Sequence, residues 1–301
     1  MPVPCFPEFA PLSLDLRNEL HPRLSLTANG VSEFTFSGLY LFRNRYAYRV
    51  SRDGPSGGFI ISGTEQKKDG SGTKTFFMTP CEAPRQNVIE SLLASHDYWK
   101  NIPEAVFELS RTRLEEWGVS VNEDRDNFDY LYFRSELAEL AGKRFHKKRN
   151  LIKQFLQTYT HDQQPLTNAL VPKAIEILDR WRQDKGEDGD YRAAREALEH
   201  FDSLALRGNI FFADGKPAAY CLGESIAKGK MFAIHFEKGI DQYKGIYQFM
   251  NKAFAVFLPR FFIYINREQD LGDPGLRQAK MTYRPAGFVK KYSGRLEKES
   301  E

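Results

Sequence analysis

Carboxylate and imidazole side chains occur together near the end of a predicted strand. The segment MFAIHFEKG, residues 231–239, has the apolar and aromatic content of a strand. Period-two alternation then predicts that His235 and Glu237 share one face, where either accepts a proton from an attacking amine. In this interpretation Glu224, on a neighbouring predicted strand, faces the same reaction cleft as His235 and Glu237. The carboxylates of Glu224 and Glu237 then repel each other, so that one of them is held protonated. The alternative is that a single histidine here is only a packing residue.

A second polar group follows the apolar segment FFIYINRE, residues 261–268. Asn266 and Arg267 come at its end, which is where α/β folds commonly place ligand contacts, and we expect them to orient a carbonyl group. The alternative is a salt-bridged loop that fastens the C-terminal tail. The further candidates for substrate contacts in this region are Lys238, Tyr243, Glu268, Asp270, Lys280, Tyr283 and Arg284.

Positive charge is concentrated in the segment GKRFHKKRNLIKQFLQTY, residues 142–159, whose first half has no acidic residue. Its apolar residues fall on one stripe of a helix, which leaves the cations free to bind phosphates of a polyanion such as a tRNA acceptor stem. The alternative is a solvated connector between domains. The residues predicted to bind substrate here are Lys143, Arg144, His146, Lys147, Lys148, Arg149 and Asn150.

Composition limits the classes of function. The 301 residues include 43 basic and 40 acidic residues, so an anionic partner must meet a local patch rather than a uniformly cationic molecule. The three cysteines and six histidines have no zinc spacing, and we expect no metal. The longest apolar stretch, residues 253–265, is interrupted by Pro259 and Arg260 and is too short to cross a bilayer. With no signal-like N-terminus, these features predict a cytoplasmic protein.

The candidate residues require elements that position them. Aromatic and β-branched runs predict strands over residues 34–52, 57–66 and 74–80, and helical spacing predicts a helix over 87–107. In the second half, helices at 170–183 and 191–204 precede a strand pair with an Asp-Gly turn at 207–226, a strand at 231–239 and a helix at 242–258. This order is that of an acyltransferase-type α/β domain, and the first half is interpreted as a degenerate second copy.

Five spaced motifs carry a resemblance to a known family: GKRFHKKRNLIKQF, HFEKG, YINREQDLG, GLRQAK and TYRP. Between Glu33 and Tyr292 the chain resembles a bacterial family grouped with the C-terminal domain of phosphatidylglycerol lysyltransferase. The resemblance implies an α/β (α+β) fold of two tandem GNAT-like domains with mixed, largely antiparallel sheets, which we expect at residues 1–140 and 141–301.

The same resemblance implies an activity. Fem-type relatives transfer an aminoacyl group from aminoacyl-tRNA to an amine or hydroxyl acceptor, so tRNA and an anionic lipid headgroup or a peptide are the implied partners, and no cofactor is required. An acyl-CoA-dependent GNAT N-acyltransferase is a second hypothesis, but the segment EKGIDQYKGIY, residues 237–247, is a poor pyrophosphate cradle. A third is a non-enzymatic protein that binds polyanions through the basic segment.

Overall fold

The computed structural model describes residues 2–67, 69–186 and 188–297, which form two compact units. The first unit takes in the chain up to residue 129, residues 269–274 and the chain from 288 onward; the second takes in residues 130–268 and 275–287. Each unit contains one mixed sheet in which a single parallel pair is surrounded by antiparallel neighbours. The α/β class and the largely antiparallel sheets confirm the predicted fold class.

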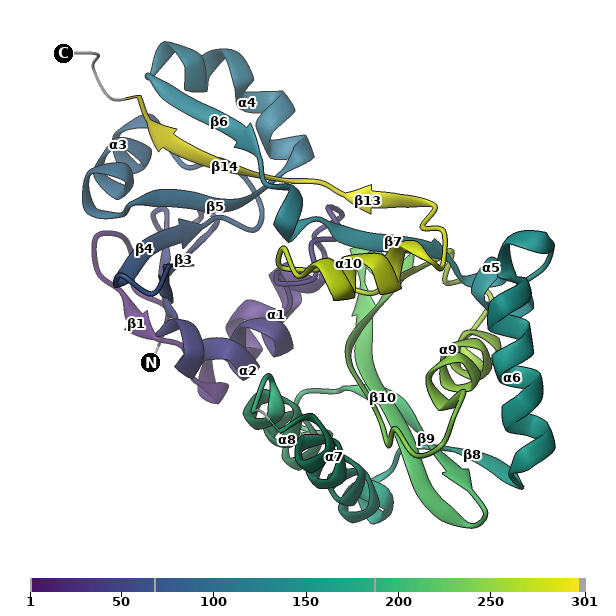
Figure 1. Ribbon diagram of the computed structural model, residues 1–301. Helices are drawn as coiled ribbons and strands as arrows, with labels where there is room; N and C mark the ends of the chain where they lie inside the picture. The colour runs from purple at the N-terminus through teal and green to yellow at the C-terminus, as the bar shows by residue number, and fades with distance from the viewer. Residues whose placement is uncertain (1, 68, 187, 298–301) are drawn as a thin grey trace. The chain divides into compact units, whose positions relative to one another are not determined.

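The sheet of the first unit has the strand order β1-β2-β3-β4-β5-β14-β6 (Figure 1). Its parallel pair is β4 with β5. The strands are β1 (Ala10–Pro11), β2 (Arg49–Arg52), β3 (Phe59–Gln66), β4 (Thr73–Met78), β5 (Tyr98–Pro103), β6 (Val119–Glu123) and β14 (Lys291–Leu296), and the α-helices are α1 (Arg17–Ser25), α2 (Phe36–Tyr46), α3 (Gln86–Ser95) and α4 (Glu104–Glu116).

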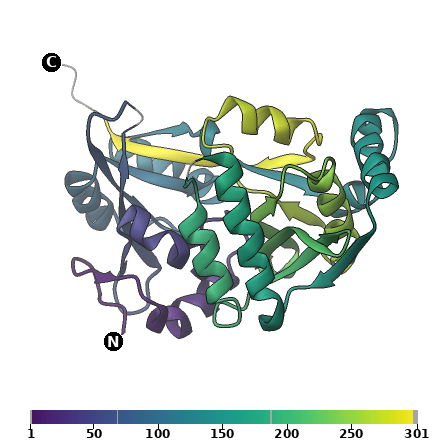
Figure 2. The same cartoon turned by 60° about the horizontal axis from the view of Figure 1, so that its bottom comes forward.

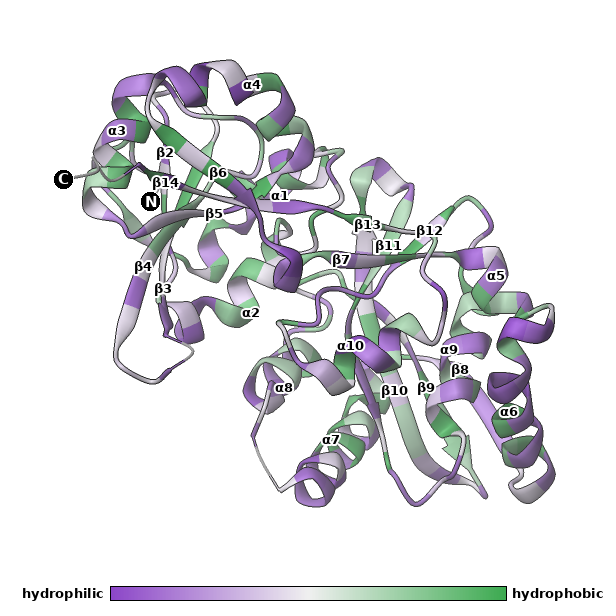
Figure 3. Ribbon diagram, turned by 45° about the horizontal axis from the view of Figure 1, so that its top comes forward, coloured by the Kyte–Doolittle hydropathy of each residue, from purple (hydrophilic) through white to green (hydrophobic). Residues whose placement is uncertain are grey.

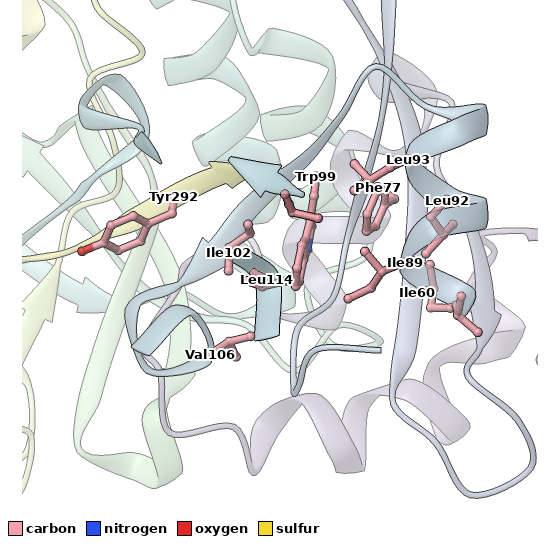
Figure 4. Packing of buried hydrophobic residues seen from close by; sticks show 12 residues of the cluster. Ile60, Phe77, Ile89, Leu92, Leu93, Trp99, Ile102, Val106, Leu114 and Tyr292 are labelled. Atoms are coloured by element: carbon pink, nitrogen blue, oxygen red, sulfur yellow. The ribbon is translucent and has the colours of Figure 1, made fainter. Parts of the chain in front are cut away.

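Helices α3 and α4 cover one face of this sheet with an apolar core (Figure 4). The indole of Trp99 on β5 stacks on the ring of Phe77 on β4, with 5.6 Å between centroids. Ile89 and Leu92 of α3 and Leu114 of α4 are buried in the same cluster. Burying side chains of this size contributes about 1.5–3 kcal/mol each, so the core fixes the two helices on the sheet.

Two predictions for the first third of the chain are wrong. Residues 36–46 of the predicted strand 34–52 form α2, because the hydroxyl of Thr35 accepts the Gly38 amide at 2.9 Å and caps the helix. Aromatic richness suggested a strand, but the buried residues Phe36, Leu39 and Tyr40 have helical spacing. The helix predicted over 87–107 is interrupted by strand β5, whose six residues are all buried.

The sheet of the second unit has the order β13-β7-β12-β11-β10-β9-β8. Asp214 and Gly215, both with positive φ, form the predicted two-residue turn between β9 and β10. The strands are β7 (Asp129–Phe133), β8 (His161–Pro165), β9 (Arg207–Ala213), β10 (Lys216–Ile226), β11 (Met231–Gly239), β12 (Tyr264–Asn266) and β13 (Gly287–Val289), and the α-helices are α5 (Arg134–Glu139), α6 (His146–Thr158), α7 (Val171–Lys185), α8 (Tyr191–Glu199), α9 (Ile246–Phe257) and α10 (Pro274–Met281).

Helices cover both faces of the second sheet. Helices α7 and α8 lie side by side on one face, whereas α9 lies on the other with α5 and α6 beside it (Figures 1 and 2). The strands β9 and β10 between them are largely hydrophobic, and the helices have hydrophilic outer faces (Figure 3). A sheet buried on both faces explains why these strands are nearly continuous apolar runs in the sequence.

The chain is distributed between the two sheets by strand exchange. Strand β7 follows the first unit in sequence but pairs with β12 in the second sheet, and the C-terminal strand β14 lies between β5 and β6 in the first sheet. Each compact unit therefore combines several separate segments of the chain, whereas the predicted domains 1–140 and 141–301 are continuous. A sequence-based division into two continuous segments does not represent this exchange.

Candidate functional site

The parallel strands β11 and β12 separate after only three paired residues. Met231 pairs with Tyr264, and the last pair is Ala233 with Asn266. Strand β11 then continues to Gly239 along β10, while the chain after β12 leaves the sheet. Side chains just beyond the last pair consequently flank an opening between the strands, and the candidates on both strands lie there.

A β-bulge places His235 at this opening. Across β10 and β11, Leu222 pairs with Phe236 and Gly223 with Ile234, so His235 is an extra residue. Directly paired residues of neighbouring strands point to the same face of the sheet. The extra residue His235 therefore shifts which residues of β11 point to each face on either side of the bulge. Glu237 points with Cys221 to the α9 face, whereas His235 reaches Glu224 on the opposite face. The prediction that His235 and Glu237 share a face is therefore wrong.

His235 is held between two carboxylates on the α7 face. Its Nδ1 lies 2.7 Å from Oε1 of Glu268, and its Nε2 lies 3.1 Å from Oε1 of Glu224. Burial lowers the imidazole pKa, but the two carboxylates outweigh this effect and raise it to about 10. The ring is thus an imidazolium that donates from both nitrogens. It has no lone pair with which to accept a proton from a substrate.

Arg267 and Glu237 form an ion pair on the α9 face. Nη2 of Arg267 donates to Oε2 of Glu237, and both side chains are largely buried. The guanidinium lies 5.2 Å from the ring centroid of Tyr283 and 5.8 Å from that of Tyr132. Burial lowers the guanidinium pKa, but Glu237 outweighs it and keeps the pKa above its usual value, so Arg267 is a permanent cation.

Three buried polar atoms of this group have no hydrogen-bond partner in the described part of the chain. They are Oε1 of Glu237, Nε of Arg267 and the hydroxyl of Tyr283, which is only 6% exposed. Leaving such a group unpaired costs about 1–3 kcal/mol, and native proteins rarely collect several at one place. One acceptor and two donors of this group are therefore unsatisfied within the described structure.

Lys148, in the first turn of α6, completes the group. Its Nζ lies 3.9 Å from the ring centroid of Tyr283, and none of the ion pairs in the described segments includes it. Burial, followed by the charge of Arg267, lowers the pKa of the Lys148 amine to about 8. A lysine with this pKa is partly neutral at a slightly alkaline pH and is able to accept a proton.

Lys280 and Asn266 fix the backbone between the two faces. The Lys280 ammonium donates to the carbonyl oxygens of Arg267 and, at 3.1 Å, of Glu268. Oδ1 of Asn266 accepts the Glu268 amide at 2.7 Å, which supports the positive φ of 56° at Glu268. These contacts hold the backbone so that the Arg267 side chain points to the α9 face and that of Glu268 to the α7 face. Asn266 and Lys280 therefore position the site rather than offer contacts to a ligand.

The other predicted site residues do not converge on the opening. Asp270 belongs to the first unit, where it binds Arg125 at 3.4 Å. Lys238 is buried on the α7 face and bonds to Asp190 at 2.6 Å, Tyr243 packs edge-on against Tyr159, and Arg284 is exposed on a turn.

The basic segment divides into structural and exposed cations. Arg149 donates to the carbonyl oxygens of Leu140 and Gly142 at 2.5 and 2.6 Å, and thereby caps the end of α5. Arg144 pairs with Glu136 at 2.5 Å. Exposed positions that stay candidates for phosphate contacts are Lys143, His146, Lys147 and Asn150.

Sequence reasoning did not identify Tyr132. This residue lies on β7, and its hydroxyl donates to the Lys280 carbonyl at 2.8 Å beneath the Arg267 guanidinium. The pairing of β7 with β12 depends on the strand exchange, which the sequence does not indicate. The signal that could have identified Tyr132 is the aromatic-rich run of residues 130–133, which comes shortly before the predicted domain boundary at 140/141.

The N-terminus of α9 is covered by α6. Gly245 precedes α9 with a φ of 91°, and a Cβ there would lie 2.5 Å from the Leu151 carbonyl oxygen of α6. The ring of Phe155 stacks on that of Phe249 at 4.8 Å. Helix N-termini bind phosphates through exposed amides, but this one is packed against a neighbouring helix.

The first unit has a counterpart of the opening. Strands β4 and β5 separate after the pair Phe77–Trp99, and the next residue, Lys100, forms an ion pair with Glu65. Asn101 then has a φ of 53°, close to that of Glu268 at the matching position. Nearby, Lys291 is fully buried between two carboxylates, those of Glu33 and, at 2.7 Å, Asp129.

Two features are absent from the described residues. No group of His, Cys, Asp and Glu side chains there is arranged to hold a metal ion. None of the helices in the described ranges is long and apolar enough to cross a membrane.

Comparison with known proteins identifies relatives. The family model described as "Phosphatidylglycerol lysyltransferase, C-terminal" matches residues 24–294. A conserved protein of unknown function from Bacteroides thetaiotaomicron is similar with 28% identity and a TM-score of 0.81 over 96% of this chain and 99% of that one. No curated protein matches.

More distant structures share the fold. The C-terminal domain of a putative lysylphosphatidylglycerol synthetase from Agrobacterium fabrum has a TM-score of 0.63 with 13% identity, over 95% of this chain and 92% of that domain. FemX has a TM-score of 0.59 with 8% identity, over 96% of this chain and 97% of its own. These likenesses confirm the predicted tandem GNAT-like architecture.

Proposed function

Because this chain belongs to the family of the phosphatidylglycerol lysyltransferase C-terminal domain, we propose that its second unit is an acyltransferase that moves an aminoacyl group from an activated ester, such as aminoacyl-tRNA, to an amine or hydroxyl acceptor. The observation that carries this proposal is the group of unpartnered atoms on Glu237, Arg267 and Tyr283. Their chemistry matches an aminoacyl group better than a simple acyl group.

The match is between donors and acceptors. An aminoacyl group has an ammonium, which donates hydrogen bonds, beside a carbonyl oxygen, which accepts them. Oε1 of Glu237 is an acceptor for the ammonium, and Nε of Arg267 with the Tyr283 hydroxyl are donors for the carbonyl oxygen. An acetyl group would leave the Glu237 oxygen unpaired at a cost of about 1–3 kcal/mol.

The proposed step is acyl transfer. The acceptor nitrogen or oxygen forms a bond to the donor's carbonyl carbon, and the bond from that carbon to the ester oxygen breaks. Negative charge that develops on the carbonyl oxygen is stabilised by Arg267 and Tyr283. Neutral Lys148 takes the proton of the acceptor, and the released ribose hydroxyl of the tRNA gains a proton. The ester is already activated, so positioning supplies much of the rate.

His235 has a positioning role in this proposal. As an imidazolium bonded to Glu224 and Glu268, it ties β11 to the chain after β12 and thereby sets the width of the opening. The exposed cations Lys143 and Lys147 lie in the same basic segment as Lys148 and would contact the phosphates of the donor RNA.

The test is transfer of a radiolabelled amino acid from bulk charged tRNA to acceptors of three kinds: a phosphatidylglycerol micelle, a peptide amine and a soluble polyol. Wild-type transfer that falls at least about 100-fold in Arg267→Met, with folding verified by circular dichroism, supports the proposal, since removing one donor to a developing oxyanion costs about 10²–10³ in rate. Absence of transfer from every charged tRNA to each acceptor would refute it.

A binding experiment separates the donor classes. Filter binding of tRNA should weaken several-fold in Lys143→Gln/Lys147→Gln and remain unchanged in Lys216→Gln, a matched exposed lysine at the first position of β10. The packing of α6 on the N-terminus of α9 supports an RNA-linked donor over coenzyme A. Calorimetric binding of coenzyme A that tRNA does not affect would instead favour an acyl-CoA-dependent enzyme.

A further inference from the structure

Exposed apolar side chains gather at the end of the second unit where β11 and β12 begin, opposite to the opening. Three neighbouring segments supply them. The Arg134 amide bonds to the Ile263 carbonyl oxygen and its guanidinium to the Ala255 carbonyl oxygen, both at 3.0 Å. We call the set the end patch, and its members, with their exposed fractions, are Phe133 (38%), Val256 (60%), Phe257 (46%), Phe261 (65%) and Ile263 (49%).

This concentration is not typical of a water-exposed surface. The described residues include twelve exposed large hydrophobics, and five of them belong to the end patch although its segments are short. Isolated exposed apolar residues need no explanation, but a contiguous group of them marks an interaction surface. Phe261 and Ile263 lie in the loop between α9 and β12, and both side chains are exposed there.

Cations lie on two of the segments beside the end patch, whereas α5, which follows Phe133, has Glu139 and also Glu136, which pairs with Arg144. Lys228, Lys230 and Arg260 are exposed, and the amides of Ile263 and Tyr264 lie 2.9 and 3.4 Å from the Lys230 carbonyl oxygen. Neither segment 227–234 nor segment 253–266 contains an acidic residue. The patch thus combines aromatic and aliphatic tips with a rim of three positive charges.

This combination favours one kind of partner. In a symmetric pair of copies the same patch meets itself, so the cationic rims would oppose each other. An anionic lipid surface complements both parts, because its headgroups attract the cations and its interface takes up the apolar side chains. We propose that the end patch docks the protein on an anionic membrane surface, with Phe257, Phe261 and Ile263 inserted at the interface. This inference goes beyond the proposed transfer reaction.

The test is co-sedimentation with vesicles of phosphatidylcholine alone and of phosphatidylcholine with roughly one third phosphatidylglycerol. We expect the wild-type protein to bind the anionic vesicles only. Each basic residue near such a surface is worth about 1 kcal/mol, so Lys228→Gln/Lys230→Gln/Arg260→Gln should reduce binding by about 100-fold. Phe261→Ser/Ile263→Ser should also reduce it at least tenfold.

Matched controls identify the surface. Leu109→Ser removes an 82% exposed leucine of α4 in the first unit, and Lys216→Gln removes an exposed cation elsewhere in the second unit; both should bind as the wild type does. Equal losses in Leu109→Ser and in Phe261→Ser/Ile263→Ser would overturn the proposal, as would no binding of the wild type.

Two further measurements distinguish membrane docking from self-association and from loss of the transfer reaction. Sedimentation velocity that shows a dimer abolished by Phe261→Ser/Ile263→Ser would overturn the membrane proposal in favour of self-association. Transfer of an amino acid to a water-soluble acceptor should be unchanged in the same variant, because the end patch does not include the atoms of the opening. Failure of the docking proposal is therefore distinguishable from failure of the proposed function.

Discussion

Each unit holds a buried cation between two carboxylates near the place where its parallel strands separate, but the two cations differ in kind. In the first unit Lys291 lies between Glu33 and Asp129, and in the second His235 lies between Glu224 and Glu268. A neighbouring cation is paired in both units, Lys100 with Glu65 and Arg267 with Glu237.

The difference lies in what is left unpaired. In the second unit, charged groups that belong to the ion pair itself, Glu237 and Arg267, retain free atoms, whereas Glu65 of the first unit also accepts the Tyr98 hydroxyl at 2.5 Å. In the first unit the carboxylate of Glu65 is bonded to two other side chains. In the second unit Glu237 and Arg267 each retain an atom that could bond to a ligand, and for this reason we propose that the reaction takes place there.

The largest expected effect is on the stability of the first unit. Lys291→Met leaves the Glu33 and Asp129 carboxylates facing each other in a buried place, and we expect a loss of about 3–5 kcal/mol in the free energy of unfolding. Urea titration followed by circular dichroism measures it. The neighbouring Lys290→Met removes only exposed ion pairs with Glu104 and Glu123, which water screens, and should change the free energy of unfolding far less. Equal losses in the free energy of unfolding of the two variants would show that the buried cluster of Lys291, Glu33 and Asp129 stabilises the protein no more than an exposed ion pair does.

The second prediction is that the Glu237–Arg267 ion pair, but not the Glu65–Lys100 ion pair, affects the rate of transfer. Glu237→Gln replaces the anionic acceptor for the ammonium, and the loss of one charged hydrogen bond, about 1.5–3 kcal/mol, should slow transfer by roughly 10- to 100-fold. Single-turnover assays with charged tRNA measure the effect. Glu65→Gln in the first unit should transfer at the wild-type rate. If Glu65→Gln also slows transfer, the assignment of the reaction to the second unit is wrong.

The third prediction concerns pH and His235. Its folded-state pKa of about 10 is above the unfolded value, so its stabilising contribution is complete below about pH 6.5 and is lost as pH rises through 10. We expect the wild type to lose stability between about pH 6.5 and 10 more steeply than His235→Gln does, and the two curves to run parallel above that range. Urea midpoints across this range test it, and curves for the two proteins that are parallel within it would contradict the imidazolium assignment.

The smallest effect should appear at Lys148. Proton acceptance by its neutral amine makes the transfer rate rise with pH to a plateau above about 8. Arg267 is the lesser cause of the low pKa and burial the greater, so Arg267→Gln should move the Lys148 pKa upward only partly toward 10.5. Competitive labelling with limiting acetic anhydride reports that pKa by mass spectrometry. A Lys148 that labels like exposed Lys216 would exclude the proton-accepting role.

The sequence was sufficient to predict several elements that carry the site. Strand β11 has the predicted bounds, and Arg267 follows β12 as expected, because apolar runs of this length between turn residues favour strands. Period-two reasoning failed at His235, since a bulge depends on pairing with β10 and leaves no signal in β11 itself. The role of Lys148 could not be separated from that of its neighbours, because the packing of α6 beside Tyr283 is tertiary.

The exchange of β7 and β14 also has a consequence for biosynthesis. The first sheet needs β14, which pairs with β5 across nearly 190 residues of chain and ends at Leu296. A ribosome adds residues one at a time from the N-terminus, so the first sheet lacks an internal strand until residues 291–296 have emerged. We therefore expect the nascent first half to depend on chaperones, and translation that stops before residue 291 to yield a product fit only for degradation.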